Sequence, residues 1–150
     1  MARRSFDTPT GTVTVEATPE AITGLRWGGA AADYSPLLRM AEAQVAGYFA
    51  GQRQAFDLPL APAGGALQQR FLAILLAIPF GETRRYGEIA RELGVSAQAV
   101  GQLCGANPIP ILIPCHRVLA ASGLGGFSGG AGVETKVALL KLEGAAGLLI

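Results

Sequence analysis

The stretch of sequence that decides the fold runs from Tyr86 to Cys104 and reads YGEIARELGVSAQAVGQLC. Its first part, Tyr86–Leu93, has the apolar spacing of a short helix, and Gly94 is placed to end it. Ser96 is a good N-cap for a second helix over Ala97–Cys104. Two short helices joined by a glycine-containing turn are typical of a helix-turn-helix, although plain packing units have the same pattern.

The sequence on either side of this pair is also mainly helical. Apolar residues predict one helix over Ala66–Ile78, ended by Pro79, and another over Glu134–Leu142. Between them, Ile109–Pro114 is apolar but contains two prolines, so it cannot be a regular helix. The glycine-rich segment Gly123–Gly132 is predicted to be a loop.

The first third of the chain has the pattern of β-strands. Short segments with β-branched or aromatic residues, separated by turn residues, predict strands at Arg3–Asp7, Thr12–Ala17, Ala21–Trp27 and Phe56–Leu60. One helix is expected between the third and fourth strands, with Ser35 as its N-cap, Pro36 at its first position and Gly51 at its end.

These elements predict a fold of the α/β plus α class in two lobes. A small α/β lobe with an antiparallel sheet is expected over residues 1–62, and a mostly helical lobe containing the helix-turn-helix over residues 63–150. The segment 61–65, which reads APAGG, is a plausible linker between them.

Composition narrows the function classes. The chain has 150 residues, half of them hydrophobic, and a net charge of +1, so neither disorder nor a strongly basic surface is indicated. No apolar run approaches the ~18 residues of a membrane span, and no secretory leader is visible. We therefore expect a cytoplasmic protein without a membrane partner, and a monomer by default.

The two cysteines and the single histidine fit neither a disulfide framework nor a zinc site. Two thiols in a chain without a leader suit a reducing compartment. One His and two Cys, with no CxxC pair, leave too few metal ligands, and no metal is expected.

The densest cluster of reactive side chains surrounds Cys115, in the sequence PCHRV at residues 114–118. Proline suits the start of a helix, which would place Cys115 in the first turn. The helix dipole and a cationic His116 or Arg117 would then lower the thiol pKa from its free value of about 8.5. A thiolate is a nucleophile suited to attack a saturated carbon.

Each residue near this thiol also has a structural interpretation. Cys115 could be a small buried hydrophobe beside a capping His116, and Asn107 a turn residue before proline. Adjacent residues in a helical turn lie about 100° apart, so a bridging water is favoured over direct Cys–His contact. Glu143 ends the last helix, where the dipole disfavours it; pairing with His116 would explain this position, and so would a solvated surface carboxylate.

Taken together, the motifs resemble the O6-alkylguanine-DNA alkyltransferase family. Ile113–Val118 is similar to the active-site signature of the family, and Asn107–Pro110 precedes it at the matching distance. The other matching segments follow the family order: Ile78–Thr83, Tyr86–Ala90, Ala99–Gly101, Ser128–Gly130 and Leu142–Gly144. The likeness is strong over residues 66–144 and loose before them, and it implies an RNase-H-like first lobe.

The resemblance implies DNA repair by a methylated-DNA–[protein]-cysteine S-methyltransferase. The alkyl group of O6-alkylguanine, with O4-alkylthymine as a candidate second substrate, would pass to Cys115 in a single turnover without a cofactor. The partner would be double-stranded DNA, bound through its minor groove, with the damaged base flipped out because O6 is unreachable in a stacked duplex.

The resemblance also assigns roles to individual residues. Glu143, His116 and a water would deprotonate Cys115, Asn107 would orient its turn, and Tyr86 would donate a proton or hydrogen bond to guanine N3. The remaining site residues would form the guanine and alkyl pocket (Pro110, Val118, Phe127 and Ser128) and the DNA-binding helix (Ser96, Gln98, Ala99 and Gly101).

Three positions depart from the family pattern. The usual intercalating arginine is Gln98 here, a basic residue before the Asn-Pro is Ala106, and a tyrosine is Phe127. These losses, with the near-neutral charge, predict weaker DNA binding than is usual. Two other functions stay open: a non-catalytic alkyltransferase-like sensor, which would lack the reactive cysteine, and a Cys–His hydrolase, for which no oxyanion hole is indicated.

Overall fold

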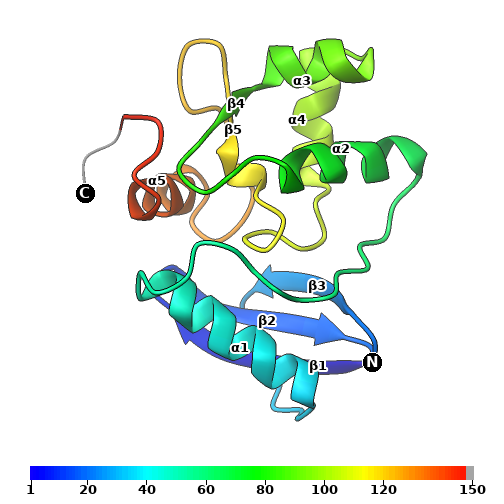
Figure 1. Ribbon diagram of the computed structural model, residues 1–150, viewed down its shortest axis with the longest axis vertical. Helices are drawn as coiled ribbons and strands as arrows, with labels where there is room; N and C mark the ends of the chain where they lie inside the picture. Colours follow the sequence, from blue (N-terminus) through cyan, green and yellow to red (C-terminus); the bar gives the residue numbers. More distant parts are fainter. Residues whose placement is uncertain (148–150) are drawn as a thin grey trace. The chain divides into compact units, whose positions relative to one another are not determined.

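The structure of the chain is a computed structural model that describes residues 1–147 (Figure 1). It divides into two compact units, Met1–Ala63 (unit 1) and Gly64–Ile150 (unit 2), which are described separately here. The boundary expected from the sequence lay between residues 62 and 63.

Unit 1 is a three-stranded antiparallel sheet with one helix. The strands β1 (Ala2–Thr8), β2 (Gly11–Ala17) and β3 (Ile22–Trp27) are neighbours in that order. Helix α1 (Pro36–Phe49) packs against β1 and β2 and covers one face of the sheet (Figure 1). Its N-cap is the expected Ser35, whose Oγ accepts a hydrogen bond from the backbone N–H of Leu38 at 3.1 Å.

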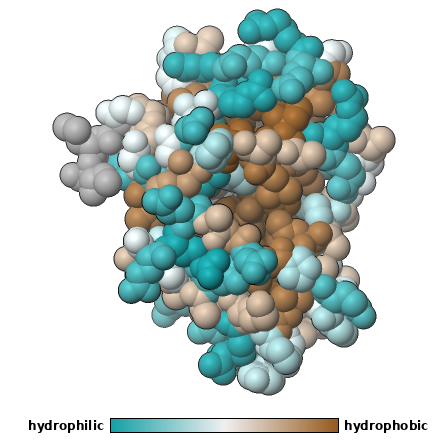
Figure 2. All heavy atoms as spheres, in the orientation of Figure 1, coloured by the Kyte–Doolittle hydropathy of each residue, from teal (hydrophilic) through white to brown (hydrophobic). Residues whose placement is uncertain are grey.

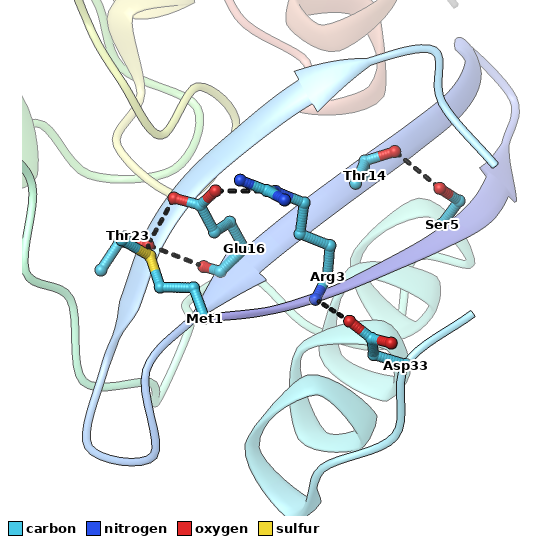
Figure 3. A network of polar contacts seen from close by, with 7 residues as sticks. All are labelled: Met1, Arg3, Ser5, Thr14, Glu16, Thr23 and Asp33. Atoms are coloured by element: carbon cyan, nitrogen blue, oxygen red, sulfur yellow. Dashed lines mark hydrogen bonds and ion pairs between the residues drawn. The ribbon is translucent and has the colours of Figure 1, made fainter. Parts of the chain in front are cut away.

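Alternation of apolar and polar residues along the strands gives the sheet its two faces. Val13 and Val15 are fully buried on the face that α1 covers. The other face carries a network of polar contacts (Figure 3). There Glu16 accepts hydrogen bonds from Arg3 at 2.9 Å and from Thr23 at 3.0 Å.

The prediction of a strand at Phe56–Leu60 is wrong. This segment forms only an isolated parallel bridge, Ile22↔Leu60. Pro59 has no N–H to donate to a ladder, and the Gln44 side chain bonds both the N–H and the carbonyl of Asp57, at 2.8 and 3.0 Å. The backbone groups that a strand would pair are therefore already satisfied.

Unit 2 is mostly helical, as expected. Its elements are α2 (Ala66–Leu76), β4 (Arg84–Arg85), α3 (Tyr86–Leu93), α4 (Ala97–Gly105), the short 3₁₀ helix η1 (Cys115–Arg117), β5 (Val118–Leu119) and α5 (Val133–Leu142). α2 ends two residues earlier than expected, because Pro79 cannot continue it and Ala77 and Ile78 form turn hydrogen bonds instead.

The α3–α4 pair follows the sequence closely. Gly94 ends α3 with a left-handed φ of 72°, and Ser96 Oγ accepts a hydrogen bond from the N–H of Ala99 at 3.1 Å. Hydrophilic side chains cover α3 at the top of the view in Figure 2. No helix within residues 1–147 is long and apolar enough to cross a membrane.

A two-residue parallel ladder positions the site. β4 pairs with β5 through Arg84↔Val118 and Arg85↔Leu119. Because α3 begins directly after β4 and η1 ends directly before β5, this ladder brings the first residue of α3, Tyr86, to the cysteine turn.

Candidate active site

The segment that leads to the cysteine is held in an uncommon conformation by one side chain. Asn107 accepts a hydrogen bond from the N–H of Ile109 at 3.0 Å and donates one to the carbonyl of Ile113 at 2.9 Å. Between them Ile111 has a φ of +71°, a region that β-branched residues rarely adopt. Such a conformation persists only where its surroundings determine it, and the Asn107 amide is one of these determinants.

Cys115 opens a 3₁₀ helix of only three residues, and its side chain is 6% exposed. Burial raises the pKa of this thiol, against the lowering effects of a hydrogen bond from Asn107 and of the charge on Lys136. The expected lowering of the thiol pKa is therefore wrong. One 3₁₀ turn has too few aligned peptides for a large dipole, and burial disfavours the thiolate more than its neighbours favour it.

The adjacent histidine belongs to a buried polar cluster. The imidazole Nε2 of His116 lies 2.8 Å from Glu143 Oε2. The guanidinium of Arg117 donates to both oxygens of the same carboxylate, each at 2.9 Å, and to the carbonyl of Ile78 at 2.6 Å. Glu143 at the end of α5 is thus buried and paired with His116, as one of the two interpretations of its position proposed.

Burial and the charge of Arg117 together set the charge state of this cluster. Its bidentate pairing neutralises Glu143, so a proton on His116 would add a second positive charge to a dry site. Burial lowers the pKa of His116 despite the carboxylate, and Arg117 and Lys136 lower it further. The imidazole is therefore neutral at physiological pH. Its Nδ1 is the one fully buried side-chain polar atom in residues 1–147 with no hydrogen-bond partner.

Lys136 is a part of the site that the sequence analysis missed. It lies on α5, is fully buried, and donates to the carbonyls of Val118 at 2.7 Å and Gly126 at 3.2 Å. Burial lowers its pKa, while the nearby thiols of Cys104 and Cys115 raise it. Its position among the apolar residues of VETKVALLKL could have indicated burial. Lysine is almost never fully buried unless it is paired, so a buried lysine would have pointed to a polar site.

Tyr86 and Cys104 form the wall of the site contributed by α3 and α4. Their side chains are hydrogen bonded to each other, and the Lys136 ammonium lies over the Tyr86 ring, 5.6 Å from its centroid. Burial, together with the nearby charge of Cys115, raises the pKa of the Tyr86 hydroxyl and of the Cys104 thiol to about 12 each. Both groups are therefore protonated donors at neutral pH.

Other expected pocket residues lie on the surrounding segments. Val118 is fully buried directly after η1, and Pro110 is half-buried in the bridge Pro110↔Ile113. Phe127 is half-buried and Ser128 exposed on the loop before α5. The structure gives no contact that joins Ser128 to the Cys115 thiol.

The expected DNA-binding residues lie on or before α4. Ser96 caps the helix, Gln98 and Gly101 are exposed, and Ala99 is half-buried. None of these four has a described contact with Cys115. Within residues 1–147, no three His, Cys, Asp or Glu side chains are grouped to hold a metal ion.

Comparison with known proteins identifies the family of this chain. Residues 66–145 match the family described as 6-O-methylguanine DNA methyltransferase, DNA binding domain. A curated relative from Mycobacterium tuberculosis, named methylated-DNA–protein-cysteine methyltransferase, is 42% identical over 93% of this chain and 90% of its own length. A relative of the same name from Methanosarcina acetivorans is 47% identical over 71% of this chain and 69% of its own.

A solved structure is similar across both units. The crystal structure of Mycobacterium tuberculosis OGT in complex with DNA matches with a TM-score of 0.87 and 41% identity, over 96% of this chain and 93% of that one. A buried cysteine next to the His116–Glu143 pair, on a fold that matches this structure, is consistent with the class of the curated relatives, the cysteine methyltransferases. This chain belongs to the methylated-DNA–protein-cysteine methyltransferase family.

Proposed function

We propose that this protein repairs DNA directly by moving the alkyl group of O6-alkylguanine to Cys115, once per molecule. The observation that supports this most is the pairing of a buried, neutral His116 with Glu143, one residue from a thiol whose pKa burial raises. Such a thiol needs a base to become a nucleophile, and the orphan Nδ1 of His116 is the base available.

The proton leaves Cys115 through a bridging water to Nδ1 of His116. The Nε2–H of the resulting imidazolium donates to Glu143, which holds the ring orientation. Asn107 and the charge of Lys136 both favour the thiolate once it forms. Sγ then attacks the alkyl carbon, an S–C bond forms, and the C–O6 bond breaks with its electron pair passing to the purine.

Tyr86 completes the reaction as the acid. Its hydroxyl is protonated at neutral pH and donates to guanine N3 as negative charge develops on the departing base. Val118, Phe127 and Ser128 line the guanine edge, and Pro110 bounds the alkyl group. The product thioether is a poor leaving group, so the thiol is not regenerated.

DNA binding is assigned to the α3–α4 pair acting as a helix-turn-helix. α4 would enter the minor groove, where the small Ala99 and Gly101 allow close approach and Ser96 lies at the helix start. The exposed Gln98 would fill the gap left by the flipped base, without a charge for the phosphates. O4-alkylthymine would be a weaker substrate. Unit 1 would be RNase-H-like, and the protein a cytoplasmic monomer.

The sensor alternative, which binds alkylated DNA without reacting, is disfavoured by the presence of Cys115 with its base. Mass spectrometry of the protein after incubation with a duplex containing O6-methylguanine separates the two functions. We expect a permanent gain of one methyl group on the Cys115 peptide and none on the Cys104 peptide, which is the internal control. Cys115→Ser should gain nothing. Tight duplex binding with no mass change would support the sensor.

A further inference from the structure

Gly125, in the glycine-rich loop, lies against the reactive edge of Tyr86. A Cβ added to Gly125 would lie 2.8 Å from Cε2 of Tyr86 and 3.0 Å from its hydroxyl oxygen, closer than carbon atoms tolerate. The residue also has a left-handed φ of +73°. Glycine at this position therefore lets the loop backbone press against the phenol beside its hydroxyl.

Two further groups surround the same ring. The Cys104 thiol is hydrogen bonded to the Tyr86 hydroxyl from α4, and the Lys136 ammonium lies over the ring face, 5.6 Å from the centroid. The phenol is thus bounded at its edge, at its oxygen and over one face by three different segments. No role in the reaction proposed above is assigned to Cys104 or Gly125.

We propose that Gly125 and Cys104 are positioning residues that fix the direction of the Tyr86 hydroxyl toward the departing purine. The inference rests on the proposed function and adds to it the residues that orient the acid. Gly125 blocks rotation of the phenol toward the loop, and Cys104 holds the hydroxyl between reactions.

The chemistry of sulfur suits this task. A thiol is a weak hydrogen-bond acceptor, so the Tyr86 hydroxyl can leave Cys104 for the stronger acceptor at guanine N3. The thiol S–H can then donate to the phenol oxygen as that oxygen gains negative charge. A side chain without a polar atom at position 104 would leave the hydroxyl free to turn away.

The test is a double-mutant cycle on the single-turnover rate of methyl transfer from an O6-methylguanine duplex, measured at saturating protein. Gly125→Ala, Cys104→Ala and Cys104→Ser are each made with Tyr86 intact and with Tyr86→Phe. Gly123→Ala is the matched control, because Gly123 also has a positive φ, +148°, but has open space where its Cβ would lie.

With Tyr86 intact, we expect Cys104→Ala to slow the limiting rate about three- to tenfold, the range for losing one hydrogen bond. Gly125→Ala should slow it at least as much. Cys104→Ser should stay within about twofold of wild type because its hydroxyl replaces the thiol, and Gly123→Ala should react at the wild-type rate. Duplex affinity should not change. In the Tyr86→Phe background, none of these substitutions should slow the reaction further.

Equal slowing with and without the tyrosine hydroxyl would overturn the inference, because the residues would then support the fold and not the hydroxyl. Wild-type rates for Gly125→Ala and Cys104→Ala would overturn it as well, and so would a wild-type rate for Tyr86→Phe itself. In all three cases methylation of Cys115 would still be observed, whereas failure of the proposed function would appear as no methylation in any variant, the wild type included.

Discussion

The stability of unit 2 should fall as the pH is lowered from about 7.5 to 5, and its single histidine should be the cause. His116 is fully buried, and its pKa is lowered in the folded protein. The unfolded chain therefore binds a proton near pH 6.5 that the folded chain does not bind. Lowering the pH favours whichever state binds more protons, which here is the unfolded state, so acid lowers the stability.

The expected magnitude follows from the histidine alone. Below the unfolded pKa, each pH unit costs up to about 1.4 kcal/mol, so the loss by pH 5 is at most about 2 kcal/mol. The opposite sign would arise if His116 and Glu143 formed a simple ion pair, because the folded pKa would then be raised. Burial of the imidazole is the main physical reason for the sign we expect, and Arg117, which already neutralises this carboxylate through two hydrogen bonds, acts in the same direction.

Urea unfolding followed by far-ultraviolet circular dichroism, at constant ionic strength across this pH range, measures the effect. The chain contains one histidine and one tryptophan, and Trp27 is in unit 1. If the units unfold in separate transitions, the fluorescence of Trp27 should report a midpoint that the histidine does not influence. If the transitions coincide, both signals should follow the pH.

His116→Gln is the matched variant, since its amide can still donate to Glu143 but does not titrate. It should lower stability at neutral pH and remove most of the slope between about pH 6.5 and 5. A flat wild-type profile, a stability that increases in acid, or an unchanged slope in His116→Gln would each refute the charge arrangement described here.

Four further outcomes are expected. Asn107→Ala should destabilise the fold by about 1–3 kcal/mol and slow transfer, because two backbone groups lose their partner; equal urea midpoints would contradict this. Arg117→Met should destabilise by about 3–5 kcal/mol, since it leaves Glu143 buried beside a neutral imidazole; calorimetry would detect the change, and a small loss would show that water replaces the guanidinium. Gln98→Arg should raise the repair rate on duplex but not on the free base, in stopped-time assays; unchanged rates on both would refute the proposed weakness in DNA binding. Methylation of Cys115 should lower the melting temperature, because the added methyl group must be accommodated beside a residue that is only 6% exposed; an unchanged melting curve would contradict it.

Local patterns in the sequence were enough to predict most elements. Ser35, Gly94 and Ser96 were expected at helix ends and are found there, because capping depends on one side chain or one backbone angle. The segment Phe56–Leu60 failed because its backbone partners come from Gln44 and Ile22, which are distant in sequence. Pairing of that kind cannot be inferred from local periodicity.

The site was predictable in its members but not in its electrostatics. The pairing of His116 with Glu143 could be proposed from the sequence, because a carboxylate at the end of a helix needs a partner that offsets the unfavourable helix dipole. The two hydrogen bonds from Arg117 to Glu143 and the burial of Lys136 could not be predicted without the fold, because both depend on how α5 packs against η1. For the same reason, the thiol pKa was expected to be lowered although burial raises it.

In the proposed reaction, these electrostatics would allow a buried site to ionise a thiol. Before reaction, Arg117 and Lys136 are the cations and Glu143 the carboxylate, so the cluster carries one net positive charge. Moving the Cys115 proton to His116 leaves that sum unchanged, which avoids the large cost of bringing new charge into a buried site. The sum changes only when the alkyl group arrives and the thiolate becomes a neutral thioether. The negative charge then belongs to the purine, next to Tyr86, whose ring lies under the Lys136 ammonium. Because the resting Tyr86 pKa is about 12, its proton would leave only for a departing purine whose basicity approaches that of the phenolate. In the proposed reaction, the Lys136 ammonium would favour the Cys115 thiolate at the start, and it lies over the ring of the residue that would act as the acid at the end, 5.6 Å from the Tyr86 centroid.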